Sequence, residues 1–434
     1  MKILFVIHDF LPSHQAGAEI YTYRLAKELS KKHEICLFFT EFTSLTLSYK
    51  VTERTFNGLQ CIEVFRPFKT DLLGEPYNDT KMETIFQTVL DEFKPDIIHL
   101  QHLLYHSFRY PEIAKHNNIP VLFTLHDYWL TCPRWGQRLQ GNLEICHTVD
   151  WTKCADCLYE KPENSNRFSL QSFYHLFRQK ISRSRTSETR INSLKERNRH
   201  ILAAIENIDL FTAPSPFLRN EFIQYGIPED KIIFSDNGFD TTNFKKQKNK
   251  KDSLVRFGFI GTLCEHKGVH VLIEAFNQVP ENKAQLHIYG NLDWFPEYNS
   301  RLRKMVKSPA IFFEGLIPND EVATILSEID VLVVPSIWFE NSPLTIHEAF
   351  MAGVPVITSD IGGMADLVTD GVNGLLFAVG DSTELTKVMI KYIESETLPD
   401  QLRNGIPAVK SIEENGREIE KIYHQLLKRN IDCL

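Results

Sequence analysis

The sequence predicts an α/β protein made of two doubly wound parallel-sheet domains. Its 434 residues exceed what one hydrophobic core usually organises, so two domains are expected. Short β-branched or aromatic segments alternate with amphipathic stretches, which is typical of proteins with parallel sheets. Two such series follow one another along the chain. Each series therefore predicts its own sheet.

The elements of both series can be placed on the sequence. The first predicts a helix over residues 19–32 and strands over residues 3–8, 35–39, 97–102 and 121–125. The second predicts a helix over residues 269–279 and strands over residues 256–260, 286–289, 311–313, 331–334 and 356–359. Pro214 and Pro216 interrupt the pattern, so a hinge is expected within residues 209–216. We therefore place an N-terminal domain at residues 1–208 and a C-terminal domain at residues 209–405, with a helix over residues 411–429 that packs back on the first domain.

The charge and hydropathy of the chain exclude several classes of protein. A net charge of -8 and a pI near 6.1 do not provide the basic surface that a general nucleic-acid binder needs. The apolar run of residues 3–7 is too short for a signal peptide and is typical of a strand. No stretch reaches the roughly 18 apolar residues of a membrane-spanning helix. These features predict a cytoplasmic protein.

One segment is strongly basic. Residues 165–200 contain nine lysines or arginines and two acids, interleaved with the aromatic residues Phe168, Phe173, Tyr174 and Phe177. A solvated helical insertion is one interpretation of this composition. The other is a peripheral contact with anionic lipid headgroups on the inner face of a membrane.

The loop after the predicted strand 256–260 combines Gly261 with Lys267 and leads into a helix. Ligands of open α/β sheets bind beyond the carboxyl ends of the strands. A lysine at a helix N-terminus suits phosphate, because its charge adds to the unpaired amides and the helix dipole. The residue order is not that of a Walker A loop. A purely structural helix start is the alternative interpretation.

Two glutamates, Glu340 and Glu348, follow the predicted strand 331–334. Ser342 is a good N-cap and Pro343 suits the first helical position, so a helix is expected to begin between the two glutamates. Carboxylates at this edge of the sheet can accept hydrogen bonds from a sugar or a ribose. Two ordinary surface glutamates near a helix cap are the alternative.

Together these motifs resemble the retaining glycosyltransferases of the GT-B fold, family 4 (glycosyl transferases group 1). The similarity covers nearly the whole chain, and the order and spacing of its motifs are specific. The matching segments are Gly17-Ala18-Glu19, His126-Asp127, Asn237-Gly238-Phe239-Asp240, Gly261-x5-Lys267-Gly268, Glu340-x7-Glu348, Gly353-Val354-Pro355-Val356-Ile357, Gly362-Gly363 and Gly371-Val372-Asn373-Gly374-Leu375.

The resemblance implies two Rossmann-like domains that hold a nucleotide-sugar donor in the cleft between them, mainly against the C-terminal domain. It makes Glu348 the ribose-binding carboxylate and Glu340 a contact to hydroxyls of the donor sugar. Lys267 would stabilise the diphosphate, and His126 would lie near the donor sugar. The other donor-binding positions implied are Gly17, Gly261, Asn341, Ser342, Pro343 and Leu344.

The same resemblance implies the chemistry and the partners. The family retains the anomeric configuration, which is explained by attack on the face from which the phosphate departs, with no side-chain nucleophile. The donor implied is a UDP- or GDP-sugar, and the acceptor is a saccharide or lipid-linked saccharide of surface polysaccharide synthesis. No Asp-x-Asp motif occurs in the chain, so no catalytic metal is implied.

The chain departs from the family pattern at two positions. Thr262 stands where an arginine is usual, so one expected cation is missing. Either His266 or an arginine from elsewhere compensates for it, or the diphosphate binds more weakly. Ala16-Gly17 replaces a Gly-Gly pair, which changes the acceptor side. Two other functions share the fold: a UDP-sugar isomerase, which needs no acceptor, and a non-catalytic subunit, for which Thr262 is the only indication.

Four of the eight cysteines fall within residues 132–157. Cys154 and Cys157 form a Cys-x-x-Cys pair, which is the common chelating half of a tetrahedral zinc site. Cys132 and Cys146 are irregularly spaced. A structural zinc site, buried free thiols and a disulfide or redox role are the three interpretations.

Overall fold

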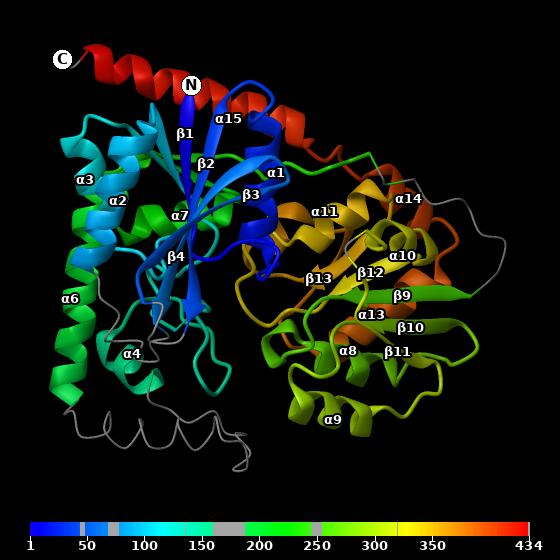
Figure 1. Ribbon diagram of the computed structural model, residues 1–434. Coiled ribbons are helices and arrows are strands. Elements are labelled where there is room, and N and C mark those ends of the chain that lie inside the picture. Colours follow the sequence, from blue (N-terminus) through cyan, green and yellow to red (C-terminus); the bar gives the residue numbers. More distant parts are fainter. Residues whose placement is uncertain are drawn as a thin grey trace. The chain divides into compact units, whose positions relative to one another are not determined.

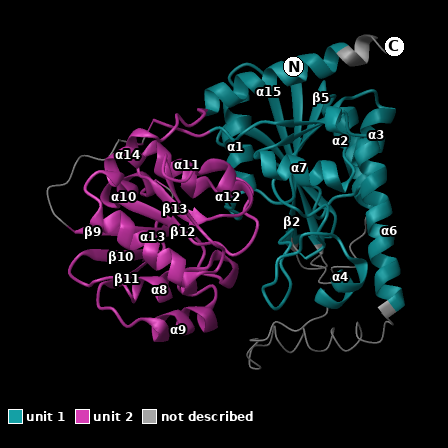
Figure 2. Cartoon of the chain, turned by 180° about the vertical axis from the view of Figure 1, so that it is seen from behind, with its two compact units in different colours: residues 1–238, 412–434 teal, residues 239–411 magenta. Residues whose placement is uncertain are grey.

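The computed structural model describes residues 1–43, 48–67, 78–134, 136–158, 187–242, 244, 254–318 and 320–432 (Figure 1). The chain divides into two compact units, which Figure 2 colours separately. Unit 1 combines Met1–Gly238 with Ile412–Leu434, and unit 2 is Phe239–Ser411. In the described residues, no helix is long and apolar enough to cross a membrane.

Unit 1 contains an eight-stranded sheet in the order β3-β4-β2-β1-β5-β6-β7-β8. The strands are β1 (Lys2–Val6), β2 (Glu34–Thr43), β3 (Lys50–Phe56), β4 (Leu59–Pro67), β5 (Ile97–Leu100), β6 (Val121–Thr124), β7 (Leu210–Ala213) and β8 (Ile232–Phe234). All neighbours pair in parallel except β3 and β4, which form an antiparallel hairpin. Asn57 and Gly58 connect the two strands with positive φ angles of 49° and 84°, as a two-residue hairpin turn requires.

Seven helices are described in unit 1: α1 (Gly17–Leu29), α2 (Thr80–Phe93), α3 (Tyr110–His116), α4 (Trp151–Cys157), α6 (Ser187–Glu206), α7 (Pro216–Tyr225) and α15 (Ile412–Asp432). A short 3-10 helix, η2 (Glu229–Lys231), precedes β8. Parallel strands need such crossover helices, because each connection must return to the same end of the sheet.

The C-terminal helix α15 lies beside α1 in unit 1 (Figure 1). Its residues Ile419, Ile422, Tyr423 and Leu426 are spaced along one helical face and belong to the same core as β1. The Tyr423 hydroxyl lies 2.7 Å from His99 Nδ1 on β5. The Tyr21 hydroxyl of α1 donates a hydrogen bond to Asn415 Oδ1 at 3.1 Å. Helix α15 is therefore an integral layer of unit 1.

The prediction of a hinge within residues 209–216 is wrong, because this segment lies inside unit 1. Residues Leu210–Ala213 form the buried strand β7, which pairs with β6 and β8. Ser215 is the N-cap of α7 and accepts a hydrogen bond from the Leu218 amide, while Pro216 is the first helical residue. Proline is tolerated there because its missing N–H would have no partner within the helix. The division between the units therefore lies at Gly238, not at residue 208.

Unit 2 contains a six-stranded parallel sheet in the order β11-β10-β9-β12-β13-β14. Its strands are β9 (Val255–Ile260), β10 (Ala284–Tyr289), β11 (Ile311–Gly315), β12 (Val331–Val334), β13 (Val356–Ser359) and β14 (Gly374–Phe377). Its helices are α8 (Val269–Phe276), α9 (Pro296–Met305), α10 (Val322–Glu328), α11 (Leu344–Met351), α12 (Gly362–Leu367), α13 (Ser382–Glu394) and α14 (Leu398–Asn404), with the 3-10 turn η3 (Glu265–Lys267). Numbered within the unit, the strand order is 3-2-1-4-5-6, which is the Rossmann order.

Candidate functional site

The strand order of unit 2 places its binding crevice between β9 and β12. These two strands are neighbours, and the chain leaves them toward opposite halves of the sheet. Such a switch point opens a crevice outside the carboxyl ends of the strands. The loops that start there are residues 261–268 after β9 and residues 335–343 after β12. The sequence-predicted residues Lys267 and Glu340 lie in these two loops.

A glycine holds the two loops together. Gly268 has a φ of +70°, and a Cβ on it would lie 1.8 Å from the carbonyl oxygen of Pro335. The Ile337 amide also donates a hydrogen bond to the His266 carbonyl at 2.9 Å. Only glycine permits both this backbone angle and this approach. The loop that carries Lys267 is therefore fixed against the end of β12.

Lys267 and Glu340 are paired directly. Lys267 Nζ donates to Glu340 Oε1 at 2.6 Å, and the same oxygen accepts hydrogen bonds from Ser336 Oγ at 2.7 Å and Trp338 Nε1 at 2.8 Å. Lys267 Nζ also lies 5.4 Å from the centre of the Trp338 ring. Burial alone would raise the pKa of Glu340, but Lys267 and the other donors outweigh it and lower this pKa. Glu340 is thus a buried, ionised carboxylate that positions the lysine.

Two glycines on α12 position the backbone beside Glu340. Gly362 has a φ of +59°, and a Cβ on Gly363 would lie 1.5 Å from the Asn341 carbonyl oxygen. The Gly363 amide donates a hydrogen bond to the Glu340 carbonyl at 2.8 Å. The segment Glu340–Asn341 therefore rests directly on the start of α12, which requires residues without side chains.

The prediction that Ser342 is the N-cap of α11 is wrong. Helix α11 begins at Leu344, one residue later than predicted, with Pro343 in the capping position and no side-chain cap. The Ser342 hydroxyl instead lies 2.9 Å from His347 Nε2, so it is held by the helix side chain. The first amides of α11 have no side-chain acceptor at the cap, which is the arrangement that suits an anion.

Glu348 lies in the second turn of α11 and is partly exposed. Its neighbours Ile346, Ala349 and Phe350 are buried in the core of unit 2. Leu344 lies four residues before Glu348 and shares its face of the helix. Glu348 is therefore carried on the side of α11 that does not face the core.

The other predicted positions of the first loop are Gly261 and Thr262. The Gly261 amide donates to the Tyr289 carbonyl at 3.1 Å, so the loop starts from a point tied to β10. His266 does not replace the cation missing at Thr262. Burial, reinforced by the charge of Lys267, lowers the pKa of His266 to about 4, so its ring is neutral near pH 7. Lys267 is the cation that this loop contributes.

Unit 1 has a second cluster of polar side chains at the carboxyl edge of its sheet. The cluster follows three neighbouring strands: β1, β5 and β6. Its members are His8, Asp9, Gln101, His102, His126 and Asp127, joined by Glu19 from α1. Only His126, Asp127 and Glu19 stood in motifs that the sequence singled out. The others could have been found from their position directly after apolar strands.

His126, which the resemblance placed near the sugar, belongs to this cluster. Its Nε2 lies 2.8 Å from Gln101 Oε1, and its ring centre lies 5.3 Å from that of Tyr21 in an edge-on arrangement. Burial, with a smaller effect from His102, lowers the pKa of His126 to about 4. A neutral His126 therefore donates its Nε2–H to Gln101.

Two contacts between a histidine and a carboxylate stand next to one another in the cluster. His8 Nε2 lies 3.0 Å from Glu19 Oε1, and His102 Nε2 lies 3.3 Å from Asp127 Oδ2. The His8 and His102 ring centres are 4.5 Å apart. The Leu104 amide donates to His102 Nδ1, and burial lowers the pKa of His102, so its single proton sits on Nε2 and faces Asp127. The cluster therefore holds one charged pair and one neutral histidine beside a carboxylate.

We expect the His8–Glu19 pair to stabilise unit 1 most between pH 4.5 and pH 6.5. Burial opposes the charge on His8, but the hydrogen bond and charge of Glu19 raise its pKa above 6.5, so its contribution is lost as the pH rises through that higher value. Burial likewise opposes the charge on Glu19, but His8 lowers its pKa below 4.5, so its contribution is lost on acidification. The measurement is the difference in melting temperature between the wild type and Glu19→Gln as a function of pH. Glu92→Gln, on the exposed face of α2, is the control, and a difference that stays constant with pH would contradict the prediction.

The remaining predicted unit 1 position, Gly17, is the first residue of α1. It is exposed, and the preceding Ala16 has an extended backbone with no side-chain cap. Glu19 lies in the first turn of the helix. The Ala16-Gly17 segment is thus an open helix start near the polar cluster.

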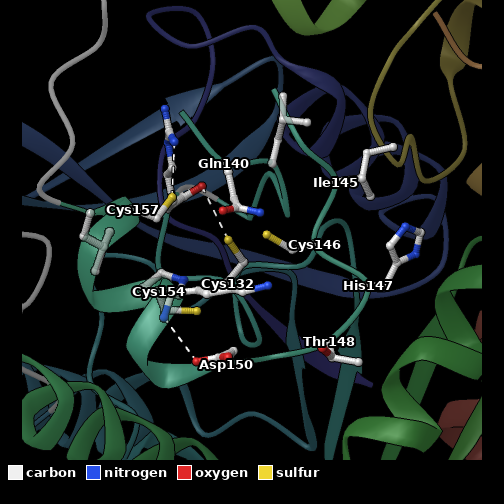
Figure 3. A pocket seen from close by; sticks show the side chains of 14 residues that line it. Cys132, Gln140, Ile145, Cys146, His147, Thr148, Asp150, Cys154 and Cys157 are labelled. Carbon is white, nitrogen blue, oxygen red and sulfur yellow. Dashed lines mark hydrogen bonds between the residues drawn. The ribbon is translucent and has the colours of Figure 1, made fainter. Parts of the chain in front are cut away.

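The four cysteines predicted to act together, Cys132, Cys146, Cys154 and Cys157, line one cavity of about 180 Å³ (Figure 3). All four are free thiols. As the described side chains stand, no three of His, Cys, Asp and Glu are close enough to hold a metal ion together. The basic segment over residues 165–186 lies outside the described residues, and residues 187–200 are part of α6.

Two protein-family models together match residues 16–408 of the chain. The model of Glycosyltransferase Family 4 matches residues 16–243, and that of Glycosyl transferases group 1 matches residues 240–408. The putative colanic acid biosynthesis glycosyltransferase WcaL of Escherichia coli K12 is 26% identical over 238 residues, which are 52% of this chain and 56% of WcaL. The GDP-mannose-dependent alpha-mannosyltransferase of Corynebacterium glutamicum is 31% identical over 190 residues, which are 42% of this chain and 43% of that protein. The chain thus spans about half the length of such relatives.

Solved structures match nearly the full length. The Anabaena protein HepE in complex with UDP and glucose has a TM-score of 0.65 and 18% identity, and the match covers 98% of this chain and 99% of HepE. At this identity the likeness concerns the fold, which is the GT-B arrangement of two parallel-sheet α/β domains. Because one family model covers more than half of the residues and a second continues to residue 408, the chain belongs to glycosyltransferase family 4.

Proposed function

We propose that the chain is a retaining glycosyltransferase. It moves a hexose-type sugar from a nucleotide-diphosphate sugar to a saccharide or a lipid-linked saccharide in surface polysaccharide synthesis. The family membership and the names of relatives such as WcaL support this class of reaction. The UDP bound by HepE and the GDP-mannose named for the mannosyltransferase support a nucleoside diphosphate donor.

The observation that carries the proposal is that the switch point of unit 2 has both a lysine, Lys267, and a helix that begins without a side-chain cap, α11. Lys267 comes from the loop after β9, and α11 begins without a side-chain cap after β12. Both supply positive potential at the edge where a Rossmann sheet binds its ligand. We assign the donor diphosphate to this place. Negative charge grows on the diphosphate as the sugar bond breaks, and fixed positive groups lower the barrier to that step.

The two glutamates take different roles in this proposal. Glu340 Oε1 already accepts three hydrogen bonds and holds Lys267 in place, so Glu340 Oε2 is the atom that would accept a hydroxyl of the donor sugar. Glu348 lies one turn into α11 and would accept the ribose hydroxyls. Gly261, Asn341, Ser342, Pro343 and Leu344 form the surrounding backbone of the donor-binding segment.

In unit 1 the proposal assigns His126 and Gly17. A neutral His126, oriented by Gln101, would act as a hydrogen-bond partner of a sugar hydroxyl and not as a cation. The exposed Gly17 would let a ligand approach the backbone at the start of α1. Attack then occurs on the face from which the diphosphate leaves, and the diphosphate accepts the proton of the acceptor. Lys267 and the α11 amides supply the positive charge, so we expect the rate to be independent of added magnesium or manganese.

The first test is a panel of nucleotide sugars offered to the purified full-length protein. We expect one donor to raise the melting temperature of the protein, because a ligand that binds the folded state stabilises it. With a saccharide acceptor, nuclear magnetic resonance should then detect a product with the anomeric configuration of the donor. Release of an altered sugar without any acceptor would indicate an isomerase instead. Binding without any turnover would indicate a non-catalytic subunit.

Glu348→Ala tests the ribose contact. We expect the dissociation constant of the donor to rise about 10- to 100-fold, because a hydrogen bond to a charged group contributes about 1.5–3 kcal/mol. Isothermal titration calorimetry with the donor found in the panel is the measurement. Glu394→Ala, on the exposed face of α13, is the matched control and should bind the donor as the wild type does. Unchanged affinity in Glu348→Ala would remove this role.

A further inference from the structure

The part of this chain around α4 packs against α6 through a small apolar cluster. Its hydrophobic cluster contains only two buried side chains in the part of the chain that the structure describes, Ala155 and Leu194. The partly buried Trp151, Leu158 and Ile191 pack against them. A core of this size contributes little stability, and small units of this kind usually need a covalent or metal crosslink.

Four thiols surround one cavity in this segment. Cys154 and Cys157 lie three residues apart on α4, so they share a helical face. Cys132 and Cys146 come from the loop that precedes α4 and line the same cavity. Figure 3 shows the four labelled cysteine side chains arranged around this space. Four cysteines from two loop positions and one helix turn are the ligand set of a closed structural zinc site.

The polar groups next to the sulfur atoms suit thiolates. The Arg134 guanidinium donates to Cys157 Sγ at 3.2 Å, and the Arg138 amide donates to Cys132 Sγ at 3.4 Å. Lys153 also lines the cavity. Four thiolates and one Zn²⁺ carry two net negative charges, which these cationic and N–H groups would offset. Donors to ligand atoms are the usual outer layer of a metal site.

We propose that Cys132, Cys146, Cys154 and Cys157 bind one structural Zn²⁺ in a tetrahedral site. Each thiol loses its proton to solvent and forms one zinc–sulfur bond, so the step involves no oxidation or reduction. Because no three of the described side chains stand close enough to share an ion, binding must draw the sulfur atoms inward to about 2.3 Å from the zinc. The ion therefore closes the loop over the cavity and crosslinks it to α4.

The site would also brace the polar cluster of unit 1. The Cys132 amide donates to the Tyr128 carbonyl at 2.7 Å, within the turn that follows Asp127. A Cβ on Gly136 would lie 2.8 Å from the Trp129 amide nitrogen and 3.1 Å from Asp127 Cγ. The loop that carries Cys132 is thus packed directly against Asp127, so its order determines where Asp127 lies.

The test is the metal content of the full-length protein purified under reducing conditions without chelators. We expect about one zinc per chain by elemental mass spectrometry, as one closed tetrahedral site predicts. Cys154→Ser and Cys157→Ser should lose most of this zinc. Cys36→Ala, which removes a buried thiol of β2 far from the segment in sequence, is the matched control and should keep it.

A second measurement does not depend on the folding of variants. Wild-type protein prepared with Co²⁺ in place of zinc should show the intense visible absorption of a tetrahedral thiolate site, together with sulfur-to-metal charge-transfer bands. Removing the metal with a strong chelator should lower the melting temperature, and Zn²⁺ should restore it. Wild-type protein without bound metal, a disulfide among the four cysteines found by mass spectrometry, or equal zinc loss in Cys36→Ala would overturn the proposal.

Discussion

Lys267→Ala is expected to lower kcat for sugar transfer by about 100-fold or more, in the range found when one preorganised group that stabilises transition-state charge is removed. Lys267 is the cation that the loop after β9 directs toward the end of β12, since Thr262 and neutral His266 supply none. The loss should appear mainly in kcat, because charge on the diphosphate is greatest in the transition state. Steady-state kinetics with the donor and acceptor found in the panel measure it.

The control for this variant is Lys283→Ala, which removes an exposed lysine that pairs with Glu394 in the same unit. It should keep the wild-type kcat. Lys267→Ala also leaves the buried Glu340 carboxylate with the hydrogen bonds of Ser336 and Trp338 alone, so its melting temperature must be measured beside its rate. The double variant Lys267→Ala with Glu340→Gln removes that unpaired charge. If Lys267 acts only by supporting Glu340, the double variant should be no slower than Glu340→Gln alone, which already lacks the carboxylate proposed to contact the donor sugar, and this would contradict a direct role of Lys267.

Gly268→Ala should destabilise unit 2 by about 3 kcal/mol or more, because it adds left-handed strain to overpacking. Its Cβ would meet the Pro335 carbonyl oxygen at 1.8 Å, which neither backbone segment can accept without moving. Such a cost should lower the melting temperature of unit 2 by roughly 6–12 °C. Since Lys267 is the preceding residue, the donor affinity should fall as well. Differential scanning fluorimetry with and without donor measures both effects.

Gly380→Ala separates the cost of left-handed backbone strain from the cost of the contact with Pro335. Gly380 has a φ of +74°, close to the +70° of Gly268, but no atom lies within 4 Å of the Cβ that alanine would add. Only the backbone strain of about 1 kcal/mol is then expected. Equal melting temperatures of the two variants would show that the contact with Pro335 carries no cost. The expected difference between them is the cost of close packing between the two loops.

Among the strands that the sequence predicted correctly, β1 and β12 have continuous apolar runs. Buried parallel strands have this pattern because both faces are covered. The hairpin of β3 and β4 was missed although Asn57-Gly58 is a strong turn signal, because its strands are half-exposed and alternate polar with apolar residues. Strand β7 was mistaken for a hinge, because prolines follow it closely and mark the start of α7. A proline at such a position indicates that one element ends or another begins, but it does not show which of the two.

The two loops that carry Lys267 and Glu340 could be located from the sequence because each follows a recognisable strand. Their interaction could not, since the 2.6 Å contact between Lys267 and Glu340 depends on how β9 and β12 become neighbours. The capping role of Ser342 was wrong because His347, one turn ahead, binds its hydroxyl. The His8–Glu19 and His102–Asp127 pairs were missed for the same reason as the lysine contact. They join residues from different strands and a helix, and sequence spacing does not encode that proximity.

The position of α15 has a consequence for the order in which the protein can be made. Unit 2 is a single continuous stretch, whereas unit 1 consists of two pieces separated by the whole of unit 2. The chain passes from unit 1 to unit 2 after Gly238 and returns to unit 1 after Ser411. These two passages lie side by side, since the Phe239 amide donates a hydrogen bond to the Lys410 carbonyl at 3.0 Å. During synthesis, unit 2 can therefore close its core before the ribosome has delivered α15. Until α15 is made, it cannot cover the apolar surface of α1, and His99 lacks its contact with Tyr423. Unit 1 is therefore completed only after the whole of unit 2 has been synthesised.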